Sequence, residues 1–241
     1  MEVNMPDQKH IVSSYDNDLE AIQAMIMKMG GLVEAAILSA ANSLEARDEE
    51  QAEMVRENDR AIDALEEQVN EECALLLARR QPIASDLRTV LTVMKISANL
   101  ERIGDYAKNM GKRTSVLVQM QPIEGAAGAI RRMAKTVEGM LKDALDSYIQ
   151  RDPELAMDVR LRDHEVDQMY NALFREFLTF MMEDPRNITA CMHLHFIAKN
   201  IERMGDHVTS ISEQVIYLVT GEVPGEGRPK VEGAMFTEAD E

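Results

Sequence analysis

Two copies of one acidic motif carry the clearest chemical signal in the sequence. Residues 99–105 and 200–206 both follow the pattern N-x-E-R-x-G-D. In each copy the glutamate and the aspartate are four residues apart, so both carboxylates lie on one face if the segment is helical. Like charges at this spacing repel each other, and a sequence that repeats them favours a compensating cation. The two pairs are Glu101 with Asp105 and Glu202 with Asp206.

A second pair of carboxylates is predicted at the same height in each half. The helix that precedes each motif runs up to a proline-containing turn, near residues 82–83 in the first half and near residues 184–185 in the second. When each hairpin is folded about its turn, two aspartates of the preceding helix come level with the motif. The sequence therefore predicts two quartets, which are Asp59, Asp63, Glu101 and Asp105, and Asp163, Asp167, Glu202 and Asp206.

Oxygen ligands of this kind suit hard cations such as Mg²⁺, Mn²⁺ or Ca²⁺, and also iron. The alternative interpretation is a solvated charged face, with Arg102 and Arg203 as counter-charges. The occurrence of the quartet in both halves favours a metal site. Each motif also contains a glycine, Gly104 or Gly205, which lowers helix propensity by ~1 kcal/mol relative to Ala. Its reuse predicts the close approach of another backbone; the alternative is that helix packing alone requires the glycine.

Six long helices are expected to position these carboxylates. Apolar residues recur at helical spacing in six segments, and prolines interrupt the pattern between several of them. The predicted helices span residues 13–46, 48–80, 85–117, 123–150, 153–183 and 187–220. Residues 1–12 are expected to form a flexible N-terminus. Residues 222–241, which are rich in Gly, Pro and Glu, are expected to form a disordered acidic tail.

The two halves of the chain repeat each other. A shift of 104 positions aligns about 39 residues with about 13 identities, and a shift of 101 positions superimposes the two acidic motifs. Short turns make successive helices antiparallel neighbours. The predicted fold class is therefore all-α, with two pseudo-symmetric antiparallel three-helix bundles. The first repeat would span residues 13–118 and the second residues 119–221.

The composition limits the classes of partner and compartment. The net charge of −17 disfavours nucleic acid and anionic membranes, and it favours metal cations or basic protein patches. The alternative is that the acidity only keeps a helical protein in solution. We identify no apolar signal core and no stretch approaching the ~20 apolar residues of a membrane span, so a cytoplasmic location is expected. Cys73 and Cys191 are predicted to be buried free thiols.

The sequence lacks the motifs that are typical of several enzyme classes. No glutamate stands three residues before any of four histidines, as a di-iron bundle would require, and no glycine-rich phosphate loop or nucleophile elbow is present. The four histidines are His164, His193, His195 and His207. We interpret His193 and His195 as packing or surface residues rather than as ligands or phospho-acceptors.

The motifs and the segments around them resemble the PhoU family. Residues 80–88 and 100–105 are similar to the first half of PhoU proteins, and residues 181–186 and 201–206 are similar to the second half. Residues 216–221 are similar to the end of the family's sequences. The resemblance covers almost the whole chain and includes both E-x-x-x-D motifs, each in the matching half.

The resemblance implies two three-helix bundles, usually in a homodimer, and a negative regulator of phosphate uptake and of the phosphate-starvation regulon. The implied partners are the ATPase subunit of the phosphate ABC transporter and a sensor histidine kinase, with only indirect membrane association. PhoU proteins bind Mg, Mn, Fe or Zn through E(D)-x-x-x-D motifs. By position these motifs fall on Glu101/Asp105 and Glu202/Asp206, and also on Asp59/Asp63 and Asp163/Asp167.

The two halves differ at positions that bear on the predicted sites. Glu66 of the first half is replaced by Tyr170 in the second, and Tyr106 is replaced by His207. The two sites are therefore expected to differ in affinity or in metal. Our leading hypothesis is a non-enzymatic, metal-binding adaptor. The alternatives are a carboxylate-bridged metalloenzyme, such as a phosphohydrolase, and a purely structural helical scaffold.

Overall fold

The computed structural model describes residues 7–80 and 85–225 of the chain. This part of the chain is all-α, as predicted, with six long helices and no strand. The helices are α1 (Asp7–Ala46), α2 (Glu49–Arg80), α3 (Ser85–Leu117), α4 (Ala126–Gln150), α5 (Pro153–Glu183) and α6 (Ile188–Thr220). A 3₁₀ turn, η1 (Pro185–Asn187), precedes α6.

Most predicted helix ends agree with the structure to within one residue, and two do not. Helix α1 begins at Asp7, before the predicted start at residue 13, so residues 7–12 belong to this helix. Helix α4 begins at Ala126 because Gly125 has φ 77°, a left-handed conformation that does not belong to a right-handed helix. Residues 222–225 follow α6 without helical structure, and the rest of the predicted tail lies outside the described residues.

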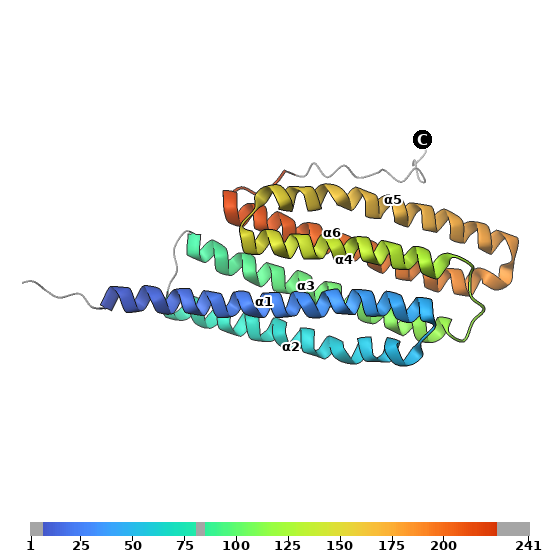
Figure 1. Ribbon diagram of the computed structural model, residues 1–241, viewed down its shortest axis with the longest axis horizontal. Helices are drawn as coiled ribbons and strands as arrows, with labels where there is room; N and C mark the ends of the chain where they lie inside the picture. Colours follow the sequence, from blue (N-terminus) through green and yellow to red (C-terminus); the bar gives the residue numbers. More distant parts are fainter. Residues whose placement is uncertain (1–6, 81–84, 226–241) are drawn as a thin grey trace, which may run out of the picture.

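The helices form two three-helix bundles that lie side by side (Figure 1). In the first bundle α1, α2 and α3 contact one another, and in the second α5 and α6 pack with α4. The bundles meet through α1 against α4 and α3 against α6, so α2 and α5 lie on the outer sides. One hydrophobic core includes buried residues from all six helices. The predicted arrangement of paired bundles is confirmed, and the bundles share their core.

The turn after the first helix of each repeat is built in the same way. Arg47 and Arg151, which are 104 positions apart, have positive φ angles of 55° and 54°. Each is followed by an aspartate that caps the next helix. Asp48 Oδ1 accepts a hydrogen bond from the backbone N–H of Gln51 at 2.9 Å, and Asp152 Oδ1 accepts one from Glu154 at 2.9 Å. The sequence repeat is therefore also a repeat of turn chemistry.

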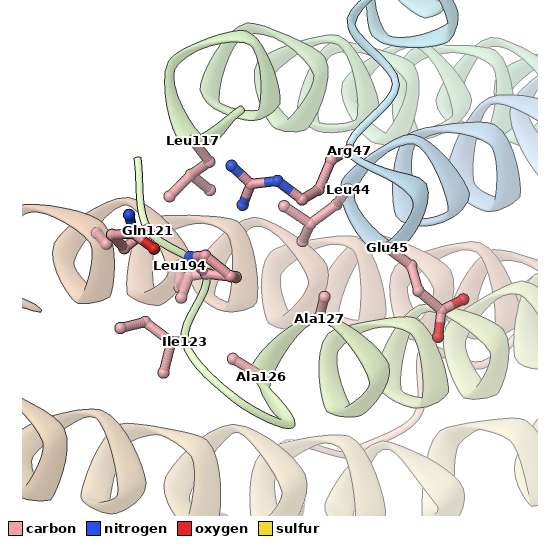
Figure 2. A pocket seen from close by; sticks show the side chains of 11 residues that line it. Leu44, Glu45, Arg47, Leu117, Gln121, Ile123, Ala126, Ala127 and Leu194 are labelled. Atoms are coloured by element: carbon pink, nitrogen blue, oxygen red, sulfur yellow. The ribbon is translucent and has the colours of Figure 1, made fainter. Parts of the chain in front are cut away.

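Arg47 also joins the two repeats. Its Nη2 donates to the backbone carbonyls of Val118 at 2.7 Å and Met120 at 2.6 Å, in the segment between α3 and α4. Figure 2 shows Arg47 at the end of α1 beside a small pocket that is also lined by Leu117 and Leu194. The side chain thus ties the end of α1 to the chain segment that begins the second repeat.

Helix α1 is rich in apolar residues, and it packs against α2, α3 and α4. Its segment Asn17–Ala46 is long and apolar enough, by length and composition, to cross a membrane, so our expectation of no such stretch was wrong for α1. Part of this segment lies in the protein core, where 39% of its most apolar stretch is buried. Met29, Val33 and Ile37 are fully buried where α1 meets α2, α3 and α4. The prediction of two buried free thiols, Cys73 and Cys191, is confirmed.

Candidate carboxylate sites

The first acidic motif lies directly against α2. A Cβ atom added to Gly104 would be 3.0 Å from Ile62 Cδ1 and 3.5 Å from Asp59 Oδ1. The glycine therefore allows α2 and α3 to approach closely, as its position in the motif predicted. It also places Asp59 at the height of the Glu101/Asp105 pair.

The second acidic motif repeats this arrangement against α5. A Cβ atom added to Gly205 would be 2.9 Å from Asp163 Oδ1 and 3.5 Å from Val166 Cγ1. Asp163 is the repeat equivalent of Asp59, and Val166 is the equivalent of Ile62. Both halves thus bring an aspartate of the outer helix to the glycine of the motif. The level predicted by folding each hairpin about its turn is confirmed for these two aspartates.

A lysine neutralises part of the first quartet. Lys108 of α3 forms an ion pair with Asp59, which is buried with 3% of its surface exposed, and its Nζ lies 3.3 Å from Asp105 Oδ1. Lys108 was not among the predicted site residues, although its position three residues after Asp105 on the same helix is a recognisable signal. Among the described residues, Asp59 Oδ1 is buried and has no hydrogen-bond partner.

Two carboxylates of the first quartet, Glu101 and Asp63, have a raised pKa because of burial and the negative charges around them. Burial raises the pKa of Glu101, and the charge of Asp105 and a hydrogen bond to it raise it further, against the opposing charge of Arg102. Burial likewise raises the pKa of Asp63, followed by the charge of Asp59. The hydrogen bond to Asp59 raises the pKa of Lys108. The quartet is therefore an electrostatically coupled set in which negative charge is in excess.

The second quartet is neutralised from a different position. Lys199 lies one turn before Glu202 on α6, and its Nζ is 2.7 Å from the Glu202 carboxylate. Burial raises the pKa of Glu202, Lys199 opposes this, and the charges of Asp206 and Asp167 raise it again. The position equivalent to Lys108 is Thr209. Each repeat therefore supplies a lysine to its carboxylates, but from non-equivalent places.

His207 turns toward the first repeat. Its Nδ1 lies 2.8 Å from Asn99 Oδ1 on α3, and its ring centroid is 5.7 Å from that of Tyr106. Burial lowers the pKa of His207. Tyr106 and His207 are the equivalent positions at which the two repeats differ, and the structure brings these two side chains into contact between α3 and α6.

The carboxylates of the quartets pair with lysines and are not gathered around one point as ligands of a metal ion would be. Within residues 7–80 and 85–225, no three His, Cys, Asp or Glu side chains are close enough together to hold a metal ion. The donor chemistry nevertheless fits a hard cation, because all ligands offered are carboxylate oxygens and the buried Asp59 Oδ1 lacks a partner. A metal ion would take over the role that Lys108 and Lys199 now have.

Known proteins share both the sequence repeat and the helical architecture of this chain. A protein-family model described as the PhoU domain matches residues 26–114 and 130–215, one match in each repeat. The chain belongs to the PhoU family. A relative from Caulobacter vibrioides, named phosphate-specific transport system accessory protein PhoU homolog, is 44% identical over 93% of this chain and 97% of its own length. A relative of the same name from Rhizobium meliloti is 43% identical over 92% of this chain and 93% of its own length.

Solved PhoU structures have the same fold. The crystal structure of PhoU from Pseudomonas aeruginosa superimposes with a TM-score of 0.82 at 38% identity, over 86% of this chain and 100% of that one. The phosphate transport system regulatory protein PhoU from Streptococcus pneumoniae gives a TM-score of 0.81 at 29% identity, over 88% of this chain and 99% of that one. The fold and family predicted from the two acidic motifs are confirmed.

Proposed function

We propose that this PhoU protein is a cytoplasmic negative regulator of phosphate uptake and of the phosphate-starvation regulon. Full-length similarity to proteins named as accessory to phosphate-specific transport carries the proposal. It would act, without catalysing a reaction, as an adaptor between the ATPase subunit of the phosphate ABC transporter and a sensor histidine kinase. The net charge of −17 supports protein partners over nucleic acid and limits any membrane association to an indirect one.

The regulatory role is tested by deleting the gene in its host and following a reporter of phosphate-responsive transcription. We expect constitutive expression in phosphate-rich medium and restoration by the intact gene. Unchanged expression after deletion would instead favour a structural scaffold. Activity of the purified protein on generic phosphoesters would favour the alternative metalloenzyme.

The adaptor role is tested by capturing the transporter ATPase and the kinase domain on the immobilised protein, with and without a chelator. We expect both partners to be retained, and the chelator to weaken at least one of them. Retention of neither partner would refute the adaptor role. If both partners are retained equally with and without the chelator, docking does not depend on a bound metal ion.

We propose further that the two quartets bind Mg, Mn, Fe or Zn ions, with Glu101, Asp105, Glu202 and Asp206 as the principal ligands. The aspartates of the outer helices, Asp59, Asp63, Asp163 and Asp167, would complete the sets. Three observations support this: the quartets occur in both repeats, each motif glycine lies beside an aspartate of the outer helix, and burial together with neighbouring carboxylate charge raises the pKa of Asp63, Glu101 and Glu202. A bound cation would stabilise the native state by mass action.

Metal binding is tested by thermal unfolding of the chelator-treated protein after each cation is added back. Replacing both Glu101 and Asp105 by Ala should remove the part of the stabilisation that belongs to the first site. A matched control is Glu67→Ala with Glu71→Ala, an exposed pair at the same spacing on α2, which should leave the stabilisation unchanged. If no cation raises the melting temperature of the wild-type protein, metal binding is refuted while the regulatory role remains testable by the reporter.

A further inference from the structure

A basic cleft lies between α3 and α6, close to the contact that joins the two repeats. Its volume is ≈580 Å³, within the usual range for small-molecule sites. Four cationic side chains, two histidines and two aromatic rings line it, and no Asp or Glu is among the lining residues that the structure describes. The cations are Lys112, Arg113, Lys199 and Arg203. In a protein of net charge −17, such a surface requires an explanation.

The positive charges of the cleft are only partly compensated. The Arg113 guanidinium lies 4.3 Å from the centre of the Phe196 ring, and its Nη1 is 3.5 Å from His193 Nδ1. Burial lowers the pKa of Arg113, and burial together with the Arg113 charge lowers the pKa of His193. Lys199 pairs with Glu202, which does not line the cleft. An anion inside the cleft would offset this excess of charge.

The cations are spread along the cleft rather than gathered at one point. Two contacts, Asn99 with His207 and Arg113 with His193, set the antiparallel register of α3 and α6. In this register, Arg203 of α6 lies level with a position of α3 that is about 10 residues before Arg113. At ~1.5 Å per residue, the two arginines are therefore ~15 Å apart along the helix axes. A ligand with several linked negative charges can contact more of these cations than a single compact anion.

The second copy of the repeat shows that the fold does not require this charge. With the shift of 101 positions, Lys112 corresponds to Glu213, Arg113 to Gln214, and Lys199 to Ala98. The other end of the α3–α6 pair thus has the same helices in the same pairing with a mixed lining, in which Arg102 stands at the position of Arg203, Lys95 at that of Phe196, and Glu213 at that of Lys112. The positive cleft is therefore a property of one end of the molecule, as expected of a binding site rather than of helix packing.

We infer that this cleft binds an oligophosphate group, either as a free linear oligophosphate or as part of a nucleotide. Linked phosphates supply closely spaced negative charges, and guanidinium groups bind their oxygens with paired hydrogen bonds. Tyr106 and Phe196 line the same cleft and offer ring surfaces beside the cations. None of the eight proposed metal ligands lines the cleft, but Lys199, which does, lies 2.7 Å from Glu202, so the cleft adjoins the second quartet.

The inference is tested by isothermal titration calorimetry of the full chain at fixed ionic strength, with EDTA present to exclude bound metal. Tripolyphosphate, ATP and inorganic phosphate are the three probes. We expect tripolyphosphate or ATP to bind at least about tenfold more tightly than inorganic phosphate. Tighter binding of ATP identifies a nucleotide as the natural source, and tighter or equal binding of tripolyphosphate identifies a free oligophosphate.

The variant Lys112→Glu with Arg113→Gln places the residue types of the second repeat into the cleft and should weaken binding at least about tenfold. Lys95→Glu is the matched control, because Lys95 is also exposed on α3 but does not line the cleft. The control should retain wild-type affinity, and circular dichroism melting verifies that both variants fold. Absence of binding by the wild-type protein, or equal losses in the two variants, would overturn the inference.

Discussion

At the scale of single residues, the carboxylates of the candidate site could be predicted from the sequence, whereas the contacts of Lys108 could not. The carboxylates were identifiable because their spacing and their occurrence in both halves are visible in the sequence. Lys108 bridges Asp59 and Asp105 only because α2 lies against the glycine of the motif, and that contact depends on tertiary packing. The sequence pattern therefore identified the acidic residues and the counter-charge Arg102, which lies 3.5 Å from Glu101 and 3.8 Å from Asp105, but not the lysines Lys108 and Lys199.

A half-buried glutamate between the repeats, Glu34, gives a pH-dependent prediction. Burial raises the pKa of Glu34, Glu138 and Asp146 raise it further, and Lys142 opposes them. A raised pKa in the folded protein means that stability is highest below the unfolded pKa and is lost as the pH rises through the folded value. Glu34→Gln should therefore stabilise the protein at pH 7 by about 0.5 kcal/mol, and the gain should vanish near pH 3.5.

Urea unfolding at the two pH values measures this difference, with chelator present throughout. Glu67→Gln, at an exposed position on α2, is the control and should change stability at neither pH. A gain from Glu34→Gln that is equal at both pH values would show that the charge of Glu34 is not its cause.

At the scale of helices, two adjacent glycines in α1 should respond in opposite ways to the same substitution. A Cβ atom added to Gly30 would lie 2.3 Å from Leu145 Cδ1, whereas one added to Gly31 meets nothing within 4 Å. Gly31→Ala should stabilise the protein by about 0.5–1 kcal/mol, because alanine favours the helix. Gly30→Ala should destabilise it by about 1–3 kcal/mol, because Leu145 is buried and must move.

Chemical denaturation of the two variants tests this prediction, and each is the control for the other. Equal changes of the same sign would contradict the close contact between α1 and α4 at Gly30. The sequence showed that a glycine pair occurs here, but it did not show which glycine faces α4, because both lie inside one continuous helical pattern.

Helix boundaries were predictable where local chemistry determines them. Asp152 and Pro153 specify the start of α5, and Gly221 specifies the end of α6 with φ 81°. The start of α4 was placed too early because Pro122 can begin a helix, but Gly125 adopts a left-handed conformation before Ala126. The apolar length of α1 was misjudged because its burial against three neighbours follows from the pairing of the repeats.

At the scale of the whole molecule, the shared core predicts that the repeats unfold together. Phe177 of α5 is fully buried in this core. Phe177→Ala should destabilise the protein by about 3–5 kcal/mol, through lost burial and the cavity left behind. Since the core is continuous, the most protected backbone amides of α2 and of α5 should both exchange hydrogen faster in this variant. The loss of protection, expressed as a free energy, should be the same in the two helices.

Hydrogen exchange with mass spectrometry resolves the two repeats separately. Met182→Ala is the control, since Met182 is 80% exposed and its truncation should change neither repeat. Faster exchange confined to residues 119–221 would show that the repeats unfold as independent domains, which is the question that the sequence repeat alone left open.

The way the two repeats face each other has a consequence for a half-length chain. Within the described residues, α1 and α3 meet their own repeat equivalents, α4 and α6, and the contacts Asn99 with His207 and Arg113 with His193 run antiparallel between α3 and α6. A fragment that stops before α4 would expose the apolar side of α1, and a second copy of the same fragment is a surface of matching shape. Such a fragment should therefore self-associate with two-fold symmetry, and sedimentation analysis of residues 1–118 would show a dimer if this is right and a monomer if it is wrong.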